Sequence, residues 1–164
     1  LVAVADVNPE KGKRAVAGLK KRHGEKVDVV EEKVFGGLDG YKKAIDAGAD
    51  LVVIATPPGF KPQQFEYAVK AGKHIFCEKP VGCSPEETAT IAARAREAGV
   101  ITGVGYNYRW APVIRYALDL VRSGRLGAVW MVQDKIMGSL DPRVRSWLHY
   151  KETGGGGVAQ AGLG

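Results

Sequence analysis

The stretch FCEKPVG, residues 76–82, places an acid, a base and a proline directly after an apolar run that is typical of a buried strand. A lysine ammonium at a fixed position, here Lys79 held by Pro80, can hydrogen-bond a hydroxyl oxygen and stabilise alkoxide charge as hydride leaves the same carbon. Free lysine titrates near pH ~10.4, so this role needs no change in its pKa. The alternative is that Glu78 and Lys79 form an ordinary surface ion pair.

Polar residues and prolines also close the other apolar runs. The first run ends at Asp6, a later one at Thr56, Pro57 and Pro58, and the last at Asn107. In open parallel sheets, ligands bind outside the carboxyl ends of the strands. We therefore expect these residues along one edge of a sheet, where they form a candidate cofactor site.

Asp6 stands just before a predicted helix. In dinucleotide-binding folds, an acid at the end of the second strand accepts hydrogen bonds from the adenosine ribose, and its charge repels the extra phosphate of NADP. The alternative is that Asp6 only helps to cap the following helix, in which Asn8 has the N-cap position. The glycine-rich turn that binds the pyrophosphate is expected before residue 1.

Pro57 and Pro58 stiffen the turn after their strand. A rigid turn at this edge can pack along a ribose or nicotinamide. The alternative is a simple strand terminator.

Apolar runs of strand length alternate with segments of helical periodicity. Strands are predicted over 1–6, 27–30, 49–58, 73–80 and 100–108, and helices over 8–24, 38–48, 62–72, 84–99 and 112–124. Ser84 with Glu87 forms a capping box, and Pro9 suits a first helical turn. The alternation predicts an α/β fold with a doubly wound parallel Rossmann sheet, whose first strand is expected upstream of residue 1.

The pattern changes after Gly127. Residues 128–139 predict the first strand of a second, mostly antiparallel sheet. We place a domain boundary near residues 107–110, so that 1–108 form a dinucleotide-binding domain and 109–164 begin an α+β domain. Because the chain begins within a strand, we interpret it as an internal piece of a longer protein.

Composition excludes several other classes. The net charge of +6 is spread along helices beside acidic residues, which favours solvated helix faces over a nucleic-acid surface. No apolar run is long enough to span a membrane, and two cysteines make no disulfide framework, which favours the cytoplasm. His74 and Cys77 are three apart on a strand and should point to opposite faces, so no metal site is predicted.

Four stretches resemble the Gfo/Idh/MocA family, named for glucose-fructose oxidoreductase and inositol 2-dehydrogenase. In order they read ADVNPEKG, DLVVIATPPGF, AVKAGKHIFCEKP and VGYNYRWAPVIRYALDLVRSGRLGAV. The resemblance implies a Rossmann domain that binds NAD or NADP, with Asp6 favouring NAD. It also implies a second domain that shapes the substrate site and mediates homo-oligomerisation. The implied activity is hydride transfer at a hydroxyl carbon of a sugar, inositol or related polyol.

The resemblance also implies residue roles. Lys79 would contact the substrate and the nicotinamide ribose. The expected cofactor-binding residues are Asp6, Asn8, Thr56, Pro57, Pro58, Glu78, Lys79 and Asn107. The expected substrate-binding residues are Lys79, Arg109, Trp110 and His149, although core packing or an interdomain contact would suit Trp110 at least as well.

The chain departs from the family pattern in two places. Where many members have Asn and His after the Ala-Thr-Pro turn, this chain has Pro58 and Lys61. If the glycine-rich end is aligned through Gly162, Gln160 takes the place of an acid and Gly164 that of the catalytic histidine; a shifted register puts this histidine beyond residue 164. A non-catalytic dinucleotide-binding relative is therefore the alternative. S-adenosylmethionine as ligand would leave Glu78, Lys79 and Pro80 without a role.

Overall fold

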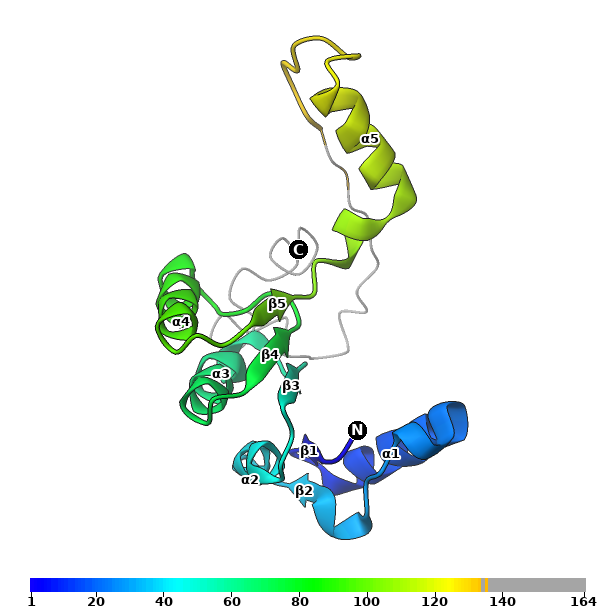
Figure 1. Ribbon diagram of the computed structural model, residues 1–164, viewed down its shortest axis with the longest axis vertical. Coiled ribbons are helices and arrows are strands. Elements are labelled where there is room, and N and C mark those ends of the chain that lie inside the picture. Colours follow the sequence, from blue (N-terminus) through cyan, green and yellow to red (C-terminus); the bar gives the residue numbers. More distant parts are fainter. Residues whose placement is uncertain (134, 136–164) are drawn as a thin grey trace, which may run out of the picture.

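The computed structural model describes residues 1–133 and 135 (Figure 1). In these residues strands and helices alternate along the chain. The elements are β1 (Val4–Asp6), α1 (Pro9–His23), β2 (Val34–Gly36), α2 (Gly40–Asp46), β3 (Leu51–Ile54), α3 (Lys61–Lys70), β4 (His74–Cys77), α4 (Pro85–Glu97), β5 (Thr102–Val104) and α5 (Pro112–Arg122). Over residues 1–124 the predicted alternation of strands and helices is confirmed, with one exception among the strands.

All strand pairs in the described part of the chain are parallel. β1 pairs with β2, and β3, β4 and β5 form a second sheet in that order. The strands thus form two parallel sheets, whereas the sequence predicted one. If the first strand of the fold is upstream, as the sequence predicted, β1 is the second strand of the doubly wound order and β3 is the fourth. In that order the first strand lies between these two, so β1 and β3 are not expected to pair with each other.

Helices cover both faces of the β1–β2 sheet, as expected for a doubly wound fold. Gly12 of α1 packs against Val4 and Val34: a methyl group at position 12 would meet the Val34 side chain at 2.9 Å. Gly40 of α2 packs instead against Phe35, which points to the other face because side chains alternate along a strand. The glycines let both helices approach the sheet closely.

The predicted strand over 27–30 is wrong. Val27 and Val29 are buried with Val16 in a small core, which explains the apolar alternation. However, the Asp28 N–H donates to the Leu1 carbonyl, upstream of β1, and a 3₁₀ turn over Glu31–Lys33 follows. The ladder with β1 is made by Val34–Gly36. The segment with alternating buried residues, 27–30, is therefore not the segment that pairs with β1, which is Val34–Gly36.

The main core lies between the second sheet and α2, α3 and α4 (Figure 1). Ile75 and Cys77 of β4 are among its most buried side chains, and Phe65 and Ala68 of α3 pack over them. On the opposite face of the sheet, Val53 remains 63% exposed. The core fixes α3 against β4 and so sets the position of the turns that follow β3 and β4.

Local capping agrees with the sequence. The Asn8 side chain accepts a hydrogen bond from the Glu10 N–H at 3.0 Å, which caps α1. The Ser84 hydroxyl accepts from the Glu87 N–H at 3.2 Å, while the Glu87 carboxylate accepts from the Cys83 N–H at 2.8 Å. The second half of the capping box thus reaches one residue further back than in the standard motif.

Beyond β5, a 3₁₀ turn over Asn107–Trp110 leads into α5, which extends away from the sheets (Figure 1). The strand predicted from residue 128 is not formed over residues 128–133, whose large apolar side chains are exposed. A strand needs a partner backbone, and no described segment pairs with this one. The described residues contain no helix that meets the length and hydropathy needed to cross a membrane.

Candidate functional site

The carboxyl ends of β3, β4 and β5 lie side by side. The Glu78 N–H donates to the Ile54 carbonyl at 2.8 Å, and the Gly105 N–H donates to the Cys77 carbonyl at 2.9 Å. Both bonds continue the parallel ladders by one residue past the strands. The turns that begin at Thr56, Glu78 and Gly105 therefore leave the sheet at one edge, as the sequence predicted for the ends of parallel strands.

Glu78 and Lys79 are half-buried at the centre of this edge. The Glu78 carboxylate accepts a hydrogen bond from the Lys79 backbone N–H at 3.2 Å. It also lies against Gly105, where an added methyl group would meet the carboxyl atoms at 2.9 Å. The turn after β4 is thus stabilised by the hydrogen bond to the Glu78 carboxylate and by the contact of that carboxylate with Gly105 after β5.

Lys61, the first residue of α3, also bonds the turn after β4. Its side chain is 2% exposed, and its Nζ donates to the Glu78 carbonyl at 2.5 Å and to the Pro80 carbonyl at 2.8 Å. Burial lowers the pKa of Lys61 because it disfavours the charged form. The sequence singled out Lys61 only as a departure from the family pattern. The feature of the sequence that could have pointed to Lys61 is its place at the start of a helix with a buried apolar face, against which a lysine side chain can pack its methylene groups.

Thr56, Pro57 and Pro58 form the turn after β3. The Thr56 hydroxyl donates to the side-chain oxygen of Gln64 at 2.6 Å, and Gln64 is a buried residue of α3. Pro58 is buried and begins a short 3₁₀ turn that leads directly into α3. The prolines therefore end the strand, as the simpler interpretation required, and they also keep the turn at the sheet edge.

Asp6 ends β1 in a half-buried position. Its carboxylate accepts a hydrogen bond from the Asn8 N–H at 2.8 Å. Asn8 in turn caps α1 with its own side chain. Asp6 thus supports the turn before the helix, and Asn8 provides the cap itself.

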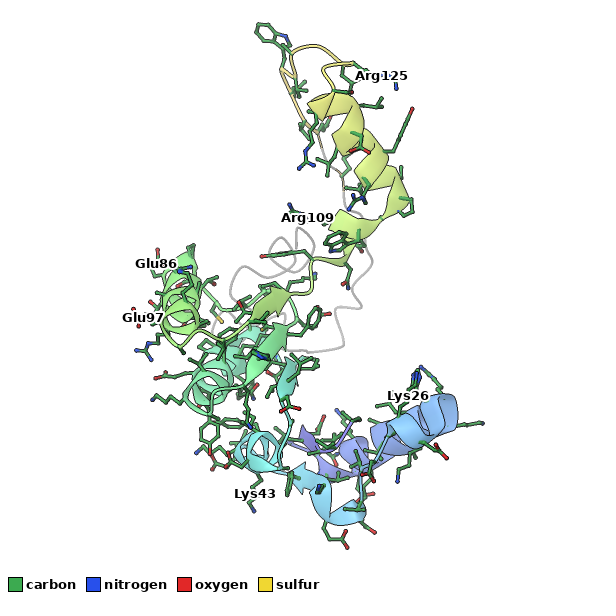
Figure 2. All side chains as sticks on the ribbon, in the orientation of Figure 1. Lys26, Lys43, Glu86, Glu97, Arg109 and Arg125 are labelled. Atoms are coloured by element: carbon green, nitrogen blue, oxygen red, sulfur yellow. The ribbon has the colours of Figure 1, made fainter. Side chains whose placement is uncertain are left out.

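Asn107, Arg109 and Trp110 follow β5 and are exposed. Arg109 and Trp110 line a small hollow of about 130 Å³ that runs along α5 as far as Arg122. The Arg115 guanidinium lies over the Trp110 ring at 5.4 Å, which is a cation–π contact. Figure 2 shows Arg109 at the base of α5, and Arg125 beyond its far end. Trp110 is therefore a surface residue in the described part of the chain.

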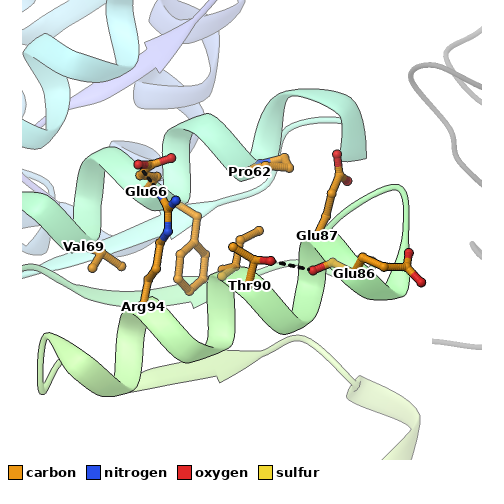
Figure 3. Close-up of a pocket in the computed structure, with 9 residues that line it drawn as sticks. Pro62, Glu66, Val69, Glu86, Glu87, Thr90 and Arg94 are labelled. Atoms are coloured by element: carbon orange, nitrogen blue, oxygen red, sulfur yellow. Dashed lines mark hydrogen bonds and ion pairs between the residues drawn. The ribbon is translucent and has the colours of Figure 1, made fainter.

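A larger groove of about 320 Å³ runs between α3 and α4 (Figure 3). Glu66 forms an ion pair with Lys70 within α3 and a second ion pair with Arg94, which joins α3 to α4. None of the predicted site residues lines this groove, so its size does not make it the candidate site. The groove is the surface seam between two packed helices.

Three residues that the sequence analysis singled out lie outside the described residues: His149, Gln160 and Gly164. Among the residues that are described, no cluster of His, Cys, Asp and Glu side chains could hold a metal ion. His74 is exposed and Cys77 buried, which confirms that they point to opposite faces of β4.

The chain matches the model of the Gfo/Idh/MocA family, described as "Oxidoreductase family, NAD-binding Rossmann fold", over residues 1–106. Among curated relatives, it is 29% identical over 158 residues to 1,5-anhydro-D-fructose reductase of Ensifer adhaerens, covering 96% of this chain and 44% of that protein. It is 32% identical over 157 residues to inositol 2-dehydrogenase of Rhizobium meliloti, covering 94% and 42%. The chain thus spans less than half the length of these relatives.

Solved structures agree with the sequence matches. An inositol dehydrogenase homolog from Azotobacter vinelandii, complexed with NAD⁺, aligns with a TM-score of 0.64 and 27% identity, covering 77% of this chain and 32% of that one. The family match covers more than half of the chain, and the parallel strands, the crossover helices and the clustered strand ends agree with it. The chain therefore belongs to the Gfo/Idh/MocA oxidoreductase family, which has an NAD-binding Rossmann fold.

Proposed function

We propose that the full-length protein is an NAD(P)-dependent oxidoreductase that transfers hydride between the nicotinamide and a hydroxyl carbon of a sugar, inositol or related polyol. One observation carries the proposal. In a chain of this oxidoreductase family, Lys79 lies in the turn at the carboxyl end of β4. Lys61 donates to the backbone carbonyls of the residues before and after it, Glu78 and Pro80. The relatives named 1,5-anhydro-D-fructose reductase and inositol 2-dehydrogenase support the substrate class.

The strand ends fit a dinucleotide. Asp6 offers a half-buried carboxylate beside the start of α1, which suits hydroxyl groups of a ribose and disfavours a phosphate. We assign cofactor contacts to residues at or just after the carboxyl ends of the strands in both sheets, namely Asp6, Asn8, Thr56, Pro57, Pro58, Glu78, Lys79 and Asn107. The bound nicotinamide supplies the acceptor or donor for hydride.

Lys79 would bind the reacting oxygen of the substrate. An ammonium there stabilises negative charge that develops on the oxygen during oxidation, and it orients the carbon that loses hydride. The Lys79 backbone N–H donates to the Glu78 carboxylate, which helps to fix the backbone from which the lysine side chain extends. We assign substrate contacts also to Arg109, Trp110 and His149.

Three further features belong to the same proposal. The domain boundary falls near residues 107–110, between the Rossmann domain and a substrate domain. The full-length protein is a homo-oligomer, and it acts in the cytoplasm. The boundary is supported by the described residues after β5, none of which pairs with a sheet.

The test uses the full-length protein with NAD⁺ and a panel of sugars and inositols. Lys79→Ala should lower kcat by about 10²-fold or more, because it removes the group that stabilises the oxyanion. The Kd for NAD⁺, measured by fluorescence titration, should rise by much less than kcat falls, because Lys79 is one of several residues to which we assign cofactor contacts. Lys70→Ala is the matched control, since Lys70 is an exposed lysine at the end of α3, and it should keep wild-type turnover. Wild-type turnover in Lys79→Ala would overturn the proposal.

A further inference from the structure

Lys61 is the most unusual charged residue in the described part of the chain. It is the first residue of α3, and only 2% of its surface is exposed. Lysines are almost never fully buried unless their ammonium groups are bonded, because desolvation of the charge is costly. Here the ammonium donates to two backbone carbonyls, those of Glu78 and Pro80.

The two carbonyls belong to the residues immediately before and immediately after Lys79. One cation thus bonds the chain on both sides of a single residue, at 2.5 Å and 2.8 Å. Backbone carbonyl oxygens are good acceptors, and bonds to a charged donor are stronger than neutral ones. The path of the backbone at Lys79 is therefore set by a side chain on the neighbouring helix.

The same helix holds the neighbouring turn. Gln64 stands three residues after Lys61, so both side chains lie on one face of α3. Gln64 accepts from Thr56 in the turn after β3, while Lys61 donates to the turn after β4. The first turn of α3 thus ties two turns of the candidate site to one rigid element.

We propose that Lys61 is a positioning residue that sets the placement of Lys79 by bonding the backbone on both sides of it. The inference rests on the proposed function, in which Lys79 binds the reacting oxygen. A displacement of about 1 Å at a catalytic group can cost about 10²-fold in rate. Lys61 thus acts on the reaction without contact with the substrate.

The experiment compares Lys61→Met with wild type in the full-length protein. Methionine keeps an unbranched apolar stem and removes the donors. We expect kcat to fall by up to about 10²-fold, with the Kd for NAD⁺ nearly unchanged. Lys61→Gln, which keeps an amide donor, should lose less. Lys43→Met is the control, because Lys43 is an exposed lysine on α2.

A second readout does not depend on turnover. Acetic anhydride labels lysine amines, and mass spectrometry gives the labelling rate of Lys79 relative to Lys73, which lies just before β4. In Lys61→Met this ratio should rise several-fold because the turn loosens, whereas a purely structural lysine would lower the Tm and leave the ratio unchanged. The proposal requires both the fall in kcat and the change in ratio, and the absence of either overturns it.

Two outcomes are kept apart. If Lys61→Met does not fold, Lys61→Leu, which also lacks donors, carries the same two measurements under the same criteria. Wild-type turnover in Lys79→Ala would refute the proposed function, whereas an unchanged labelling ratio in the Lys61 variants would refute only the positioning role.

Discussion

Gly105 and Glu78 are in close contact across the ends of β5 and β4. A methyl group at position 105 would lie 2.9 Å from the carboxyl carbon and both carboxyl oxygens of Glu78. That carboxylate accepts the hydrogen bond from the Lys79 N–H. The absence of a side chain at Gly105 therefore provides the space that the acid beside Lys79 occupies.

Gly105→Ala should displace the Glu78 carboxylate and disturb the candidate site. Because the displaced atoms are the end of a flexible side chain, the free energy of unfolding should stay within about 1 kcal/mol of wild type. The kcat/KM should fall several-fold. Gly103→Ala is the matched control, since a methyl group there would make only an ordinary contact with Phe76 at 3.5 Å. Equal kinetic effects of the two substitutions would contradict the prediction.

Asp6→Ser should shift the cofactor preference toward NADP. The carboxylate lies at the end of β1, where its charge would oppose a phosphate on the adenosine ribose. Removal of this repulsion should lower the ratio of kcat/KM for NAD⁺ over NADP⁺ by about tenfold or more. The two cofactors are compared in steady-state assays of the full-length protein. Asp50→Ser, at an exposed acid before β3, should leave the ratio unchanged, and an unchanged ratio in Asp6→Ser would refute the assigned contact.

Thr56→Val should destabilise the protein. The substitution removes the hydroxyl that donates to the buried Gln64 side chain at 2.6 Å, so the amide oxygen loses this donor. An unsatisfied buried acceptor costs about 1–3 kcal/mol. Urea denaturation of the full-length protein measures the loss. Thr56→Ser keeps the hydroxyl and should restore most of the stability; if serine and valine cost the same, the hydrogen bond is not the cause.

Glu66→Gln should have an effect that depends on pH. The hydrogen bond from Lys70 and the charge of Arg94 lower the pKa of Glu66 below its ordinary value of 4.5. A carboxyl whose folded pKa is lowered adds stability above its unfolded pKa and loses it as pH falls through the folded value. Wild type should therefore have a higher Tm than Glu66→Gln at pH 7, and the difference should vanish in acid.

Salt provides the control for the Glu66 prediction. The ion pairs are partly exposed, so high salt should screen them and reduce the difference in Tm at pH 7. A difference that grows as pH falls would show that the ion pairs are not its cause.

The order of elements and the edge that carries the site were accessible from the sequence by itself. The 3.6-residue and two-residue periods record burial over a few neighbouring residues, so they identify α1 to α5, β1 and β3 to β5. Asn8 and Ser84 bond backbone groups two and three residues away, which makes their caps local as well. Glu78 and Lys79 follow the apolar run of β4 directly, and the parallel alternation brings the ends of β3, β4 and β5 to one edge of the sheet.

Tertiary packing decided the rest. Apolar alternation at 27–30 predicted a strand, yet the ladder with β1 is made by 34–36, because burial of Val27 and Val29 does not require pairing with that strand. Lys61 bonds carbonyls 17 and 19 residues away. Nothing in its neighbouring sequence names those partners, since the contact depends on how α3 packs over β4. The sequence thus predicted which residues form the candidate site, and the packing of α3 decided what holds the turn at Glu78 and Lys79 in place.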